Sequence, residues 1–321
     1  MHYGFTLAGR GPFAQTDALS TLAKHGEALG FDALCTGDHI VVPRHITSRY
    51  PYTESGAFPG SGSGEYLEQL TVLAFLAGQT QRLQLVTSVL IVPHRNPLVA
   101  AKQLATLDVL SKGRVVVGIG VGWMREEFAA LGLPPFAERG AVTDEYLQIF
   151  KELWTSQNPS FQGQYCQFDD LDFLPKPVQH PHPPIWVGGE SRRALQRTAR
   201  YANGWYPIAA NPQFPMATPE QVQAGLARLA AFAEVEGRTL DEFDIVYRIP
   251  EYSLQQTASA ERRLFHGTAD QIAADIRQFE ALGVTHLVLD FMRHSSNLEE
   301  VLALTGCEFL AMLKLLAWAK G

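Results

Sequence analysis

An aspartate and a histidine stand next to each other, Asp38 and His39, after an apolar run that begins at Ala33. Imidazole titrates near neutral pH, so a histidine at the end of a strand can accept or donate a proton during a reaction. Adjacent side chains of a strand point to opposite faces, so only one of the two is expected to enter a site there. We interpret the pair as candidate catalytic residues; the alternative is a solvated histidine at a capped strand end.

The run GRVVVGIGVGWMREEFAALG, residues 113–132, contains a second candidate in Gly118, Gly120 and Gly122. It begins as a buried strand, becomes rich in glycine and then turns into a charged helix start. Glycine allows a planar or anionic ligand to approach bare backbone. The pattern predicts one wall of a ligand site, although small residues that are kept for packing would produce it equally well.

The sequence Gly188, Gly189, Glu190, Ser191 leads into a helix that carries Arg192, Arg193 and Arg197. Free backbone N–H groups at a helix start bind anions, and the serine hydroxyl can cap the helix or bind a phosphate oxygen. A helix end contributes roughly 0.3–1 kcal/mol and a charge-assisted hydrogen bond roughly 1.5–3 kcal/mol. One phosphate is therefore plausible here, and an ordinary capped helix is the alternative. The spacing does not match a dinucleotide-binding GxGxxG motif.

Composition limits the partners of the chain. The 321 residues carry a formal net charge of -7 and contain no basic block interleaved with aromatics, so a nucleic acid partner is not expected. No apolar stretch reaches 18 residues and the first residues lack the pattern of a signal peptide, so neither a membrane span nor export is expected. Cys35, Cys166 and Cys307 are odd in number and far apart, which favours reduced thiols, a cytoplasmic location and no metal site.

Strand-like and helix-like segments alternate along the whole chain. Eight such alternations predict an α/β fold, a (β/α)8 TIM barrel, as a single domain over residues 1–321. The expected strands are 3–7, 33–40, 83–92, 114–119, 185–188, 204–208, 243–248 and 285–291. The expected helices are 17–29, 66–77, 97–110, 143–154, 191–201, 219–236, 269–282 and 298–319.

Two long connections interrupt this alternation. Residues 42–64 follow the second strand and residues 155–184 precede the fifth, and both are rich in proline and polar residues. Long loops of this kind are commonly lids or mobile segments. Because barrels place their chemistry where strands end, all the candidate residues above are expected on one face of the barrel.

Five segments in this order resemble the bacterial luciferase-like superfamily of flavin and deazaflavin oxidoreductases. They span most of the chain and are TGDHI (36–40), VTSVLIVPHRNPLVAAKQLATLDVLSKGR (86–114), VGIGVGWMREEFAALG (117–132), PKPVQHPHPPIWVGGES (175–191) and ANGW (202–205). The resemblance is greatest to the branch that is assigned to the deazaflavin coenzyme F420. It implies a barrel that holds the cofactor ring in its mouth and transfers hydride between the cofactor and a small organic substrate, and it implies a homodimer.

The resemblance also implies roles for individual residues. It places Asp38 and His39 beside the ring, with His39 as the proton donor or acceptor, and it makes Ser88–Val89 a strand bulge that is often a cis peptide. Gly118, Gly120 and Gly122 would line the cofactor. The GGES sequence at 188–191 would receive its phosphate, with Arg192 nearby.

The chain departs from the family pattern at two positions. Luciferases carry a phosphate-binding arginine where this chain has Val121, which favours F420 over FMN, and His94 stands where relatives of this branch commonly have tyrosine. The alternatives are an FMNH2-dependent monooxygenase that works with a separate flavin reductase, and a non-catalytic flavin-binding barrel. A third is a metal hydrolase barrel that uses Asp38, His39, His94 and Asp290.

Overall fold

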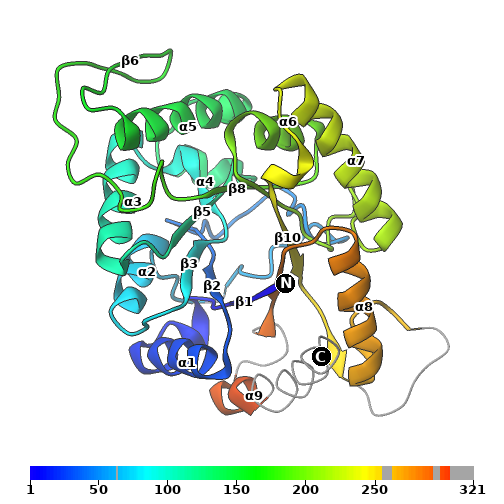
Figure 1. Cartoon of the computed structure of the whole chain (residues 1–321). Coiled ribbons are helices and arrows are strands. Elements are labelled where there is room, and N and C mark those ends of the chain that lie inside the picture. Colours follow the sequence, from blue (N-terminus) through cyan, green and yellow to red (C-terminus); the bar gives the residue numbers. More distant parts are fainter. Residues whose placement is uncertain (63, 255–261, 292–296, 304–321) are drawn as a thin grey trace.

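Parallel strands surrounded by helices form a closed barrel in the computed structural model of the chain (Figure 1). The structure describes residues 1–62, 64–254, 262–291 and 297–303. The central sheet has nine segments, of which β3 and β4 are two parts of one barrel strand, so the barrel has eight strands. The segments are β1 (His2–Thr6), β2 (Ala33–Thr36), β3 (Gln84–Thr87), β4 (Leu90–Ile91), β5 (Val115–Gly120), β8 (Ile185–Gly188), β9 (Gly204–Tyr206), β10 (Asp244–Ile249) and β13 (His286–Leu289).

The order of the strands around the barrel decides which residues face each other in its mouth. The sheet runs β3-β2-β1-β13-β10-β9-β8-β5-β4, and the pairing of Leu85 on β3 with Val115 on β5 closes the ring. The predicted (β/α)8 barrel is thereby confirmed. The predicted strand 83–92 is interrupted at Ser88 and Val89, between β3 and β4.

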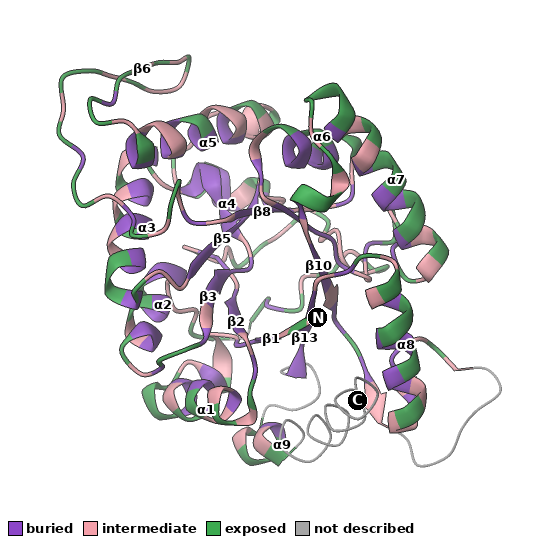
Figure 2. Cartoon of the chain, viewed as in Figure 1, coloured by how far each residue is buried: buried purple, intermediate pink, exposed green. Residues whose placement is uncertain are grey.

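The helices form an outer ring whose inward faces are buried and whose outward faces are exposed (Figure 2). They are α1 (Thr16–Leu29), α2 (Gln69–Ala77), α3 (Pro97–Ser111), α4 (Arg125–Ala130), α5 (Arg139–Thr155), α6 (Arg192–Tyr201), α7 (Pro219–Val235), α8 (Ala269–Ala281) and α9 (Leu298–Ala303). The predicted last helix, 298–319, lies outside the described residues beyond residue 303.

Local sequence explains where several of these helices begin and end. Thr218 and Thr268 form capping boxes at the starts of α7 and α8, which satisfy backbone N–H groups that the helix leaves free. Asn96 caps α3 in the same way, and α1 ends at Gly30, whose φ of 91° favours glycine.

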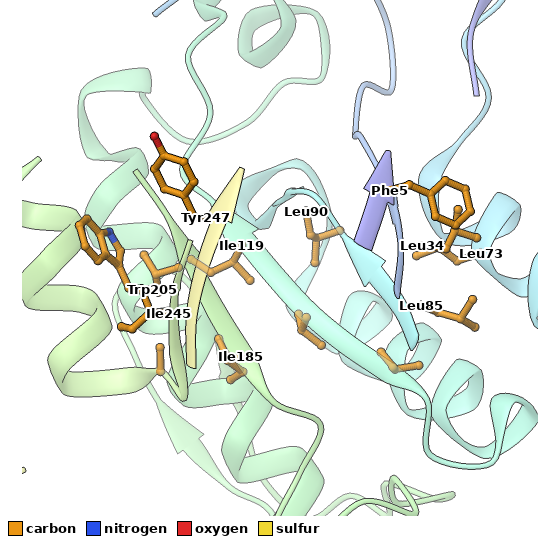
Figure 3. Packing of buried hydrophobic residues seen from close by; sticks show 14 of the residues in the cluster. Phe5, Leu34, Leu73, Leu85, Leu90, Ile119, Ile185, Trp205, Ile245 and Tyr247 are labelled. Carbon is orange, nitrogen blue, oxygen red and sulfur yellow. The ribbon is translucent and has the colours of Figure 1, made fainter. Parts of the chain in front are cut away.

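Two layers of apolar side chains hold the barrel together. The larger layer lies between the strands and the helices, and Figure 3 shows part of it, including Leu34, Leu85 and Leu73. A smaller cluster fills the inside of the barrel, with Cys35, Val116, Trp186 and other side chains from neighbouring strands. The barrel is a packed core below its mouth, which leaves the strand ends as the place for a site.

The second long insertion contains a small hairpin that sequence reasoning missed. Strands β6 (Phe161–Gln162) and β7 (Gln167–Phe168) are antiparallel and stand away from the barrel in Figure 1. A further short pair, β11 (Ser253–Leu254) and β12 (His266–Gly267), is parallel. Within the described residues, no helix is long and apolar enough to cross a membrane. Cys35 and Cys166 are free thiols, and Cys307 lies outside the described residues.

Candidate active site

A cavity of about 570 Å³ opens at the carboxyl ends of the barrel strands. Its wall includes residues from the ends of β1, β2, β5, β8, β9 and β10 and from the connection between β2 and α2. The size is within the range of cavities that hold a cofactor or a small ligand. Most of the residues that the sequence singled out lie on this wall: Asp38, His39, Ser88, Val89, Gly120, Gly122, Gly188, Gly189, Glu190 and Ser191.

His39 is fixed by a buried carboxylate. Its Nδ1 lies 2.7 Å from Oε2 of Glu127, at the start of α4, and the side chains of both residues are nearly inaccessible, with exposed fractions of 11% and 1%. A carboxylate in this position holds the proton on Nδ1, which leaves Nε2 as the ring nitrogen available for exchange. The pair has the form of an oriented acid–base group.

Glu127 is itself held in place by the backbone. Its Oε1 accepts hydrogen bonds from the N–H groups of Ile40 (2.8 Å) and Val41 (3.2 Å), and Nδ1 of His94 lies 3.9 Å away. Burial alone would raise the pKa of Glu127, but the hydrogen bond with His39, the nearby imidazoles and the backbone N–H of Ile40 lower it below the ordinary value. Glu127 is therefore an ionised group at neutral pH.

His94 is buried beside this pair and does not line the cavity. Burial lowers its pKa, although the charges of Glu127 and Asp38 act in the opposite direction. Its ring packs edge-on against Phe128 at 5.2 Å between centroids. His94, the residue that departs from the family pattern, thus packs against α4 and does not line the cavity.

Asp38 is engaged in the protein and is not free. Its two oxygens accept a forked pair of hydrogen bonds from Arg95 at 2.7 and 2.8 Å, and one of them also accepts from the N–H of Ile91 at 2.9 Å. Arg95 also bonds Glu68 at 2.6 Å, and Glu68 caps α2. Forked arginine–carboxylate pairs are rigid. Asp38 therefore connects the end of β2 to Ile91 on β4 and, through Arg95, to Glu68 at the start of α2.

Aromatic side chains from the first long insertion enclose His39. The ring of Phe58 lies 4.9 Å from the imidazole and the ring of Tyr66 lies 5.2 Å from it, between centroids. Tyr50 and Phe58 pack on Trp123, at 5.1 and 5.3 Å. The predicted lid segment therefore forms an apolar roof that limits the access of water to His39.

The Ser88–Val89 peptide is cis, as the family resemblance implied. It lies where β3 ends, and both residues line the cavity. The Ser88 hydroxyl lies 2.9 Å from the hydroxyl of Tyr206 on β9, across the inside of the barrel. This contact connects the bulge to the opposite strands.

The glycines of β5 divide between packing and the cavity. A Cβ at Gly118 would lie 2.1 Å from the carbonyl oxygen of Thr87, and Gly118 does not line the cavity, so close packing of the strands explains this residue. A Cβ at Gly120 would lie 2.6 Å from Val89 Cγ2, and Gly122 has a φ of 85°. These two do line the cavity, so both explanations apply to them.

A second region of the cavity lies at the start of α6 and combines a helix N-terminus with arginine side chains. Ser191 caps this helix through its hydroxyl, with the N–H of Ala194 at 3.2 Å. Arg193 and Arg139 line the cavity there, and the expected Arg192 does not: its guanidinium lies over the Phe232 ring at 5.9 Å. Along a helix, neighbouring positions face different directions, so the charge at the cavity comes from the residue after the predicted one.

The arginines of this region crowd one another. Burial, and then the neighbouring charges of Arg125 and Arg193, lower the pKa of Arg139. Four arginines that line the cavity form no ion pair with a carboxylate of the described residues: Arg10, Arg49, Arg139 and Arg193. An acidic protein therefore has a positively charged cavity, and this favours an anionic ligand.

Glu190 is a buried carboxyl group on the cavity wall. It accepts hydrogen bonds from the N–H of Ile208 at 2.9 Å and from the amide of Asn211 at 2.5 Å. Burial raises its pKa to about 7, although these hydrogen bonds oppose the shift. Both oxygens connect the β8–α6 turn to the loop after β9, which positions the turn.

Sequence reasoning missed Glu127 and Arg139, and it assigned Arg192 instead of the neighbouring Arg193 to the cofactor. Glu127 belongs to the quoted run 113–132, and its place in the first turn of a helix directly after a glycine-rich strand was the available signal. Within the described residues, no group of three or more His, Cys, Asp or Glu side chains is arranged to hold a metal ion. The two aspartates of the proposed hydrolase set are each paired with an arginine, Asp38 with Arg95 and Asp290 with Arg248.

Comparison with known sequences assigns the family. The model of the luciferase-like monooxygenase family matches residues 4–265. An uncharacterized protein of Mycobacterium tuberculosis is 33% identical over 206 residues, which are 64% of this chain and 71% of that protein. An FMNH2-dependent dimethylsulfone monooxygenase of Pseudomonas putida is 38% identical over 149 residues, 46% of this chain and 40% of that enzyme.

Comparison with solved structures supports the fold. A monooxygenase from Streptomyces bottropensis superposes with a TM-score of 0.76 and 23% identity, covering 98% of this chain and 99% of that one. An F420-dependent secondary alcohol dehydrogenase superposes with a TM-score of 0.73 and 18% identity, covering 97% and 98%. The chain therefore belongs to the luciferase-like monooxygenase family of oxidoreductases.

Proposed function

We propose that this oxidoreductase transfers a hydride between reduced coenzyme F420 and a small organic substrate, in one direction or the other. The observation that carries the proposal is that His39, which is paired with Glu127, lines a cavity that is also lined by arginines without an ion pair to a described carboxylate. A proton-transfer group and an anion-binding region in one cavity suit a cofactor that has a reactive ring at one end and a phosphate at the other.

The cavity fits such a cofactor in its polar groups and in its open backbone. Buried Thr36 Oγ1 and Gln69 Oε1 have no hydrogen-bond partner in the described part of the chain, and both residues line the cavity. A hydroxyl donor beside an amide acceptor suits the imide edge of an isoalloxazine-type ring. Gly189, with a φ of 109°, leaves open backbone beside the Ser191 cap for the phosphate.

The count of charges favours coenzyme F420 over FMN. Each cofactor carries one phosphate group, and F420 carries the carboxylates of a glutamyl tail in addition. Arg139 and Arg193 at the start of α6 are sufficient for a phosphate, and Arg10 and Arg49 remain as further cations on the wall. Charged partners for a longer anionic tail are thus present.

The reaction requires the protein to position groups and to move one proton. Bound coenzyme F420 supplies the hydride chemistry. Glu127 keeps the proton on His39 Nδ1, and Nε2 exchanges a proton with the substrate oxygen or nitrogen. The roof formed by Phe58, Tyr50 and Trp123 excludes water, and Asp38 acts as a positioning residue that holds the end of β2 through Arg95.

The FMNH2-dependent monooxygenase is the second candidate. It is favoured by the similarity to the dimethylsulfone monooxygenase, a relative with a stated activity that is 38% identical over 149 residues. In that case a separate flavin reductase would supply the reduced cofactor. The family resemblance supports a homodimer that acts in the cytoplasm for either candidate.

Titration of the purified protein with coenzyme F420 and with FMN, followed by cofactor fluorescence, tests the choice. We expect F420 to bind at least about tenfold more tightly, because more arginines would be paired. Binding of FMN alone would reverse the choice, and binding of neither would reject the function. Loss of turnover in His39→Ala with retained cofactor binding would separate an enzyme from a non-catalytic flavin-binding barrel.

A further inference from the structure

One wall of the cavity carries hydrogen-bond donors that the proposed cofactor and proton chemistry leave unused. Arg248 on β10 donates a hydrogen bond from Nη2 to Oδ2 of Asp290 at 3.0 Å, and both residues line the cavity. The Nε of Arg248 is buried and has no partner among the described residues. A buried donor without a partner is unusual in a folded protein and indicates that a ligand provides the acceptor.

A second unused donor lies on a neighbouring strand. The hydroxyl of Thr6, at the end of β1, is buried and likewise lacks a partner in the described ranges. The strand order β1-β13-β10 places Thr6 on β1, Asp290 directly after β13 and Arg248 on β10, so they belong to three consecutive strand ends. The residues assigned to the cofactor come from β2, β3, β5, β8 and the helices near them, so this wall lies on the other side of the mouth.

Resting on the oxidoreductase function proposed above, we infer that Arg248 and Thr6 form a subsite for an oxyanion of the substrate, and that the substrate is an organic carboxylate. The guanidinium group presents its donors in one plane, which matches the two oxygens of a carboxylate. Asp290 bonds Nη2, which holds the guanidinium in place and leaves Nε as a donor for the ligand.

The charge of the cavity also favours an anion. Six arginines and three carboxylate residues line the cavity, so a cationic substrate would meet uncompensated positive charge. A neutral amide carries no negative charge, so its hydrogen bonds to the guanidinium would be weaker than those of a carboxylate. His39 follows the end of β2, the strand next to β1, so a substrate held at Thr6 would lie near the proton-transfer group.

Benzoate and benzamide provide a matched pair of probes for the protein without cofactor. Ligand-observed NMR titration measures the dissociation constant of each for the wild type and for three variants, Arg248→Lys, Thr6→Val and Arg193→Gln. We expect benzoate to bind the wild type at least about tenfold more tightly than benzamide. Arg248→Lys, which keeps the charge and loses the planar fork, should weaken benzoate about tenfold, and Thr6→Val should weaken it severalfold.

Arg193→Gln is the control, because it removes a charge at the anion region near α6 and leaves the Arg248 wall intact. Benzoate binding that is lost in Arg193→Gln and retained in Arg248→Lys and Thr6→Val would overturn the subsite, as would equal binding of benzoate and benzamide. If Arg248→Lys does not fold, Thr6→Val decides alone. The outcome is separate from the cofactor titration: failure of both cofactors to bind would reject the oxidoreductase function and leave the benzoate result readable.

Discussion

Replacing Glu127 with glutamine should impair the reaction and also weaken the fold, because one carboxylate serves both. The substitution keeps the shape of the side chain and removes its charge. An amide can still accept from the N–H groups of Ile40 and Val41 through its oxygen, but its NH2 group then faces His39 Nδ1 at a distance of 2.7 Å in the wild type. This geometry forces the proton of His39 onto Nε2 or breaks the contact.

The magnitude follows from the three hydrogen bonds that Glu127 accepts. A hydrogen bond to a charged group contributes about 1.5–3 kcal/mol and a neutral one about 0.5–1.5 kcal/mol, so each bond weakens by about 1 kcal/mol. Glutamine avoids the cost of burying a charge, which offsets part of the loss. We expect Glu127→Gln to lower the free energy of unfolding by about 1–3 kcal/mol at pH 7.

The effect on stability has a defined dependence on pH. The pKa of Glu127 in the folded protein lies below the ordinary value of 4.5. A carboxylate whose pKa is lowered by folding stabilises the protein above its unfolded pKa, and this contribution is lost as the pH falls through the folded pKa. The difference in stability between wild type and Glu127→Gln should therefore be constant from pH 6 to 8 and shrink below about pH 4.5.

Urea unfolding at several pH values measures the free energy of unfolding. Steady-state kinetics measures kcat, and a cofactor titration measures the dissociation constant of the cofactor. We expect kcat to fall at least about tenfold while the cofactor dissociation constant changes less than twofold. Glu145→Gln is the control, since Glu145 also accepts three hydrogen bonds, all of them from backbone N–H groups of residues 164–166, but does not line the cavity. An unchanged kcat, or an equal fall of kcat in the control, would refute the role of Glu127.

Three further predictions follow from the same structure. Arg193→Gln should weaken cofactor binding about tenfold in a fluorescence titration, while Arg192→Gln should not, because Arg192 lies over Phe232 outside the cavity. Folding raises the pKa of Glu190 to about 7, so its contribution to stability is present at low pH and lost as the pH rises through 7; wild type should lose about 1–3 kcal/mol relative to Glu190→Gln between pH 5 and pH 8, as measured by urea unfolding. Gly118→Ala should lower the free energy of unfolding by about 3 kcal/mol, because its Cβ would meet the Thr87 oxygen at 2.1 Å, whereas Gly78→Ala, whose Cβ has 3.6 Å to the nearest atom, should not.

The barrel could be predicted because its periodicity is local. Each strand is a short apolar run between helices with one apolar face, and helix caps such as Thr218 and Thr268 are visible in the sequence. The hairpin β6–β7 could not be predicted, because its strands are two residues each and are held by contacts outside the segment. Glu145, on α5, accepts the backbone N–H groups of its turn, and no pattern within 155–184 records that.

The candidate site was predicted where neighbours in sequence are neighbours in space. Asp38 and His39 both reach the cavity wall, yet only contacts over more than fifty residues show that Arg95 engages one and Glu127 the other. The arginine at the start of α6 is a different case, because the sequence predicted Arg192 at the cavity and the structure places Arg193 there. Position 192 and position 193 differ by 100° around a helix, and the sequence does not fix which of them faces the barrel axis.

The structure also changes the argument from Val121. An arginine at that position would bring positive charge to the cavity from the end of strand β5, and from the sequence alone its absence favours F420 over FMN. Arg139 brings the charge from α5 instead, where its Nε bonds the carbonyl of Gly122 at 3.1 Å. The valine alone therefore does not separate F420 from FMN, because a phosphate meets a cation in either case. The distinction depends on the arginines beyond those needed for one phosphate, Arg10 and Arg49, and their removal should reduce the preference for F420 while leaving the binding of FMN unchanged.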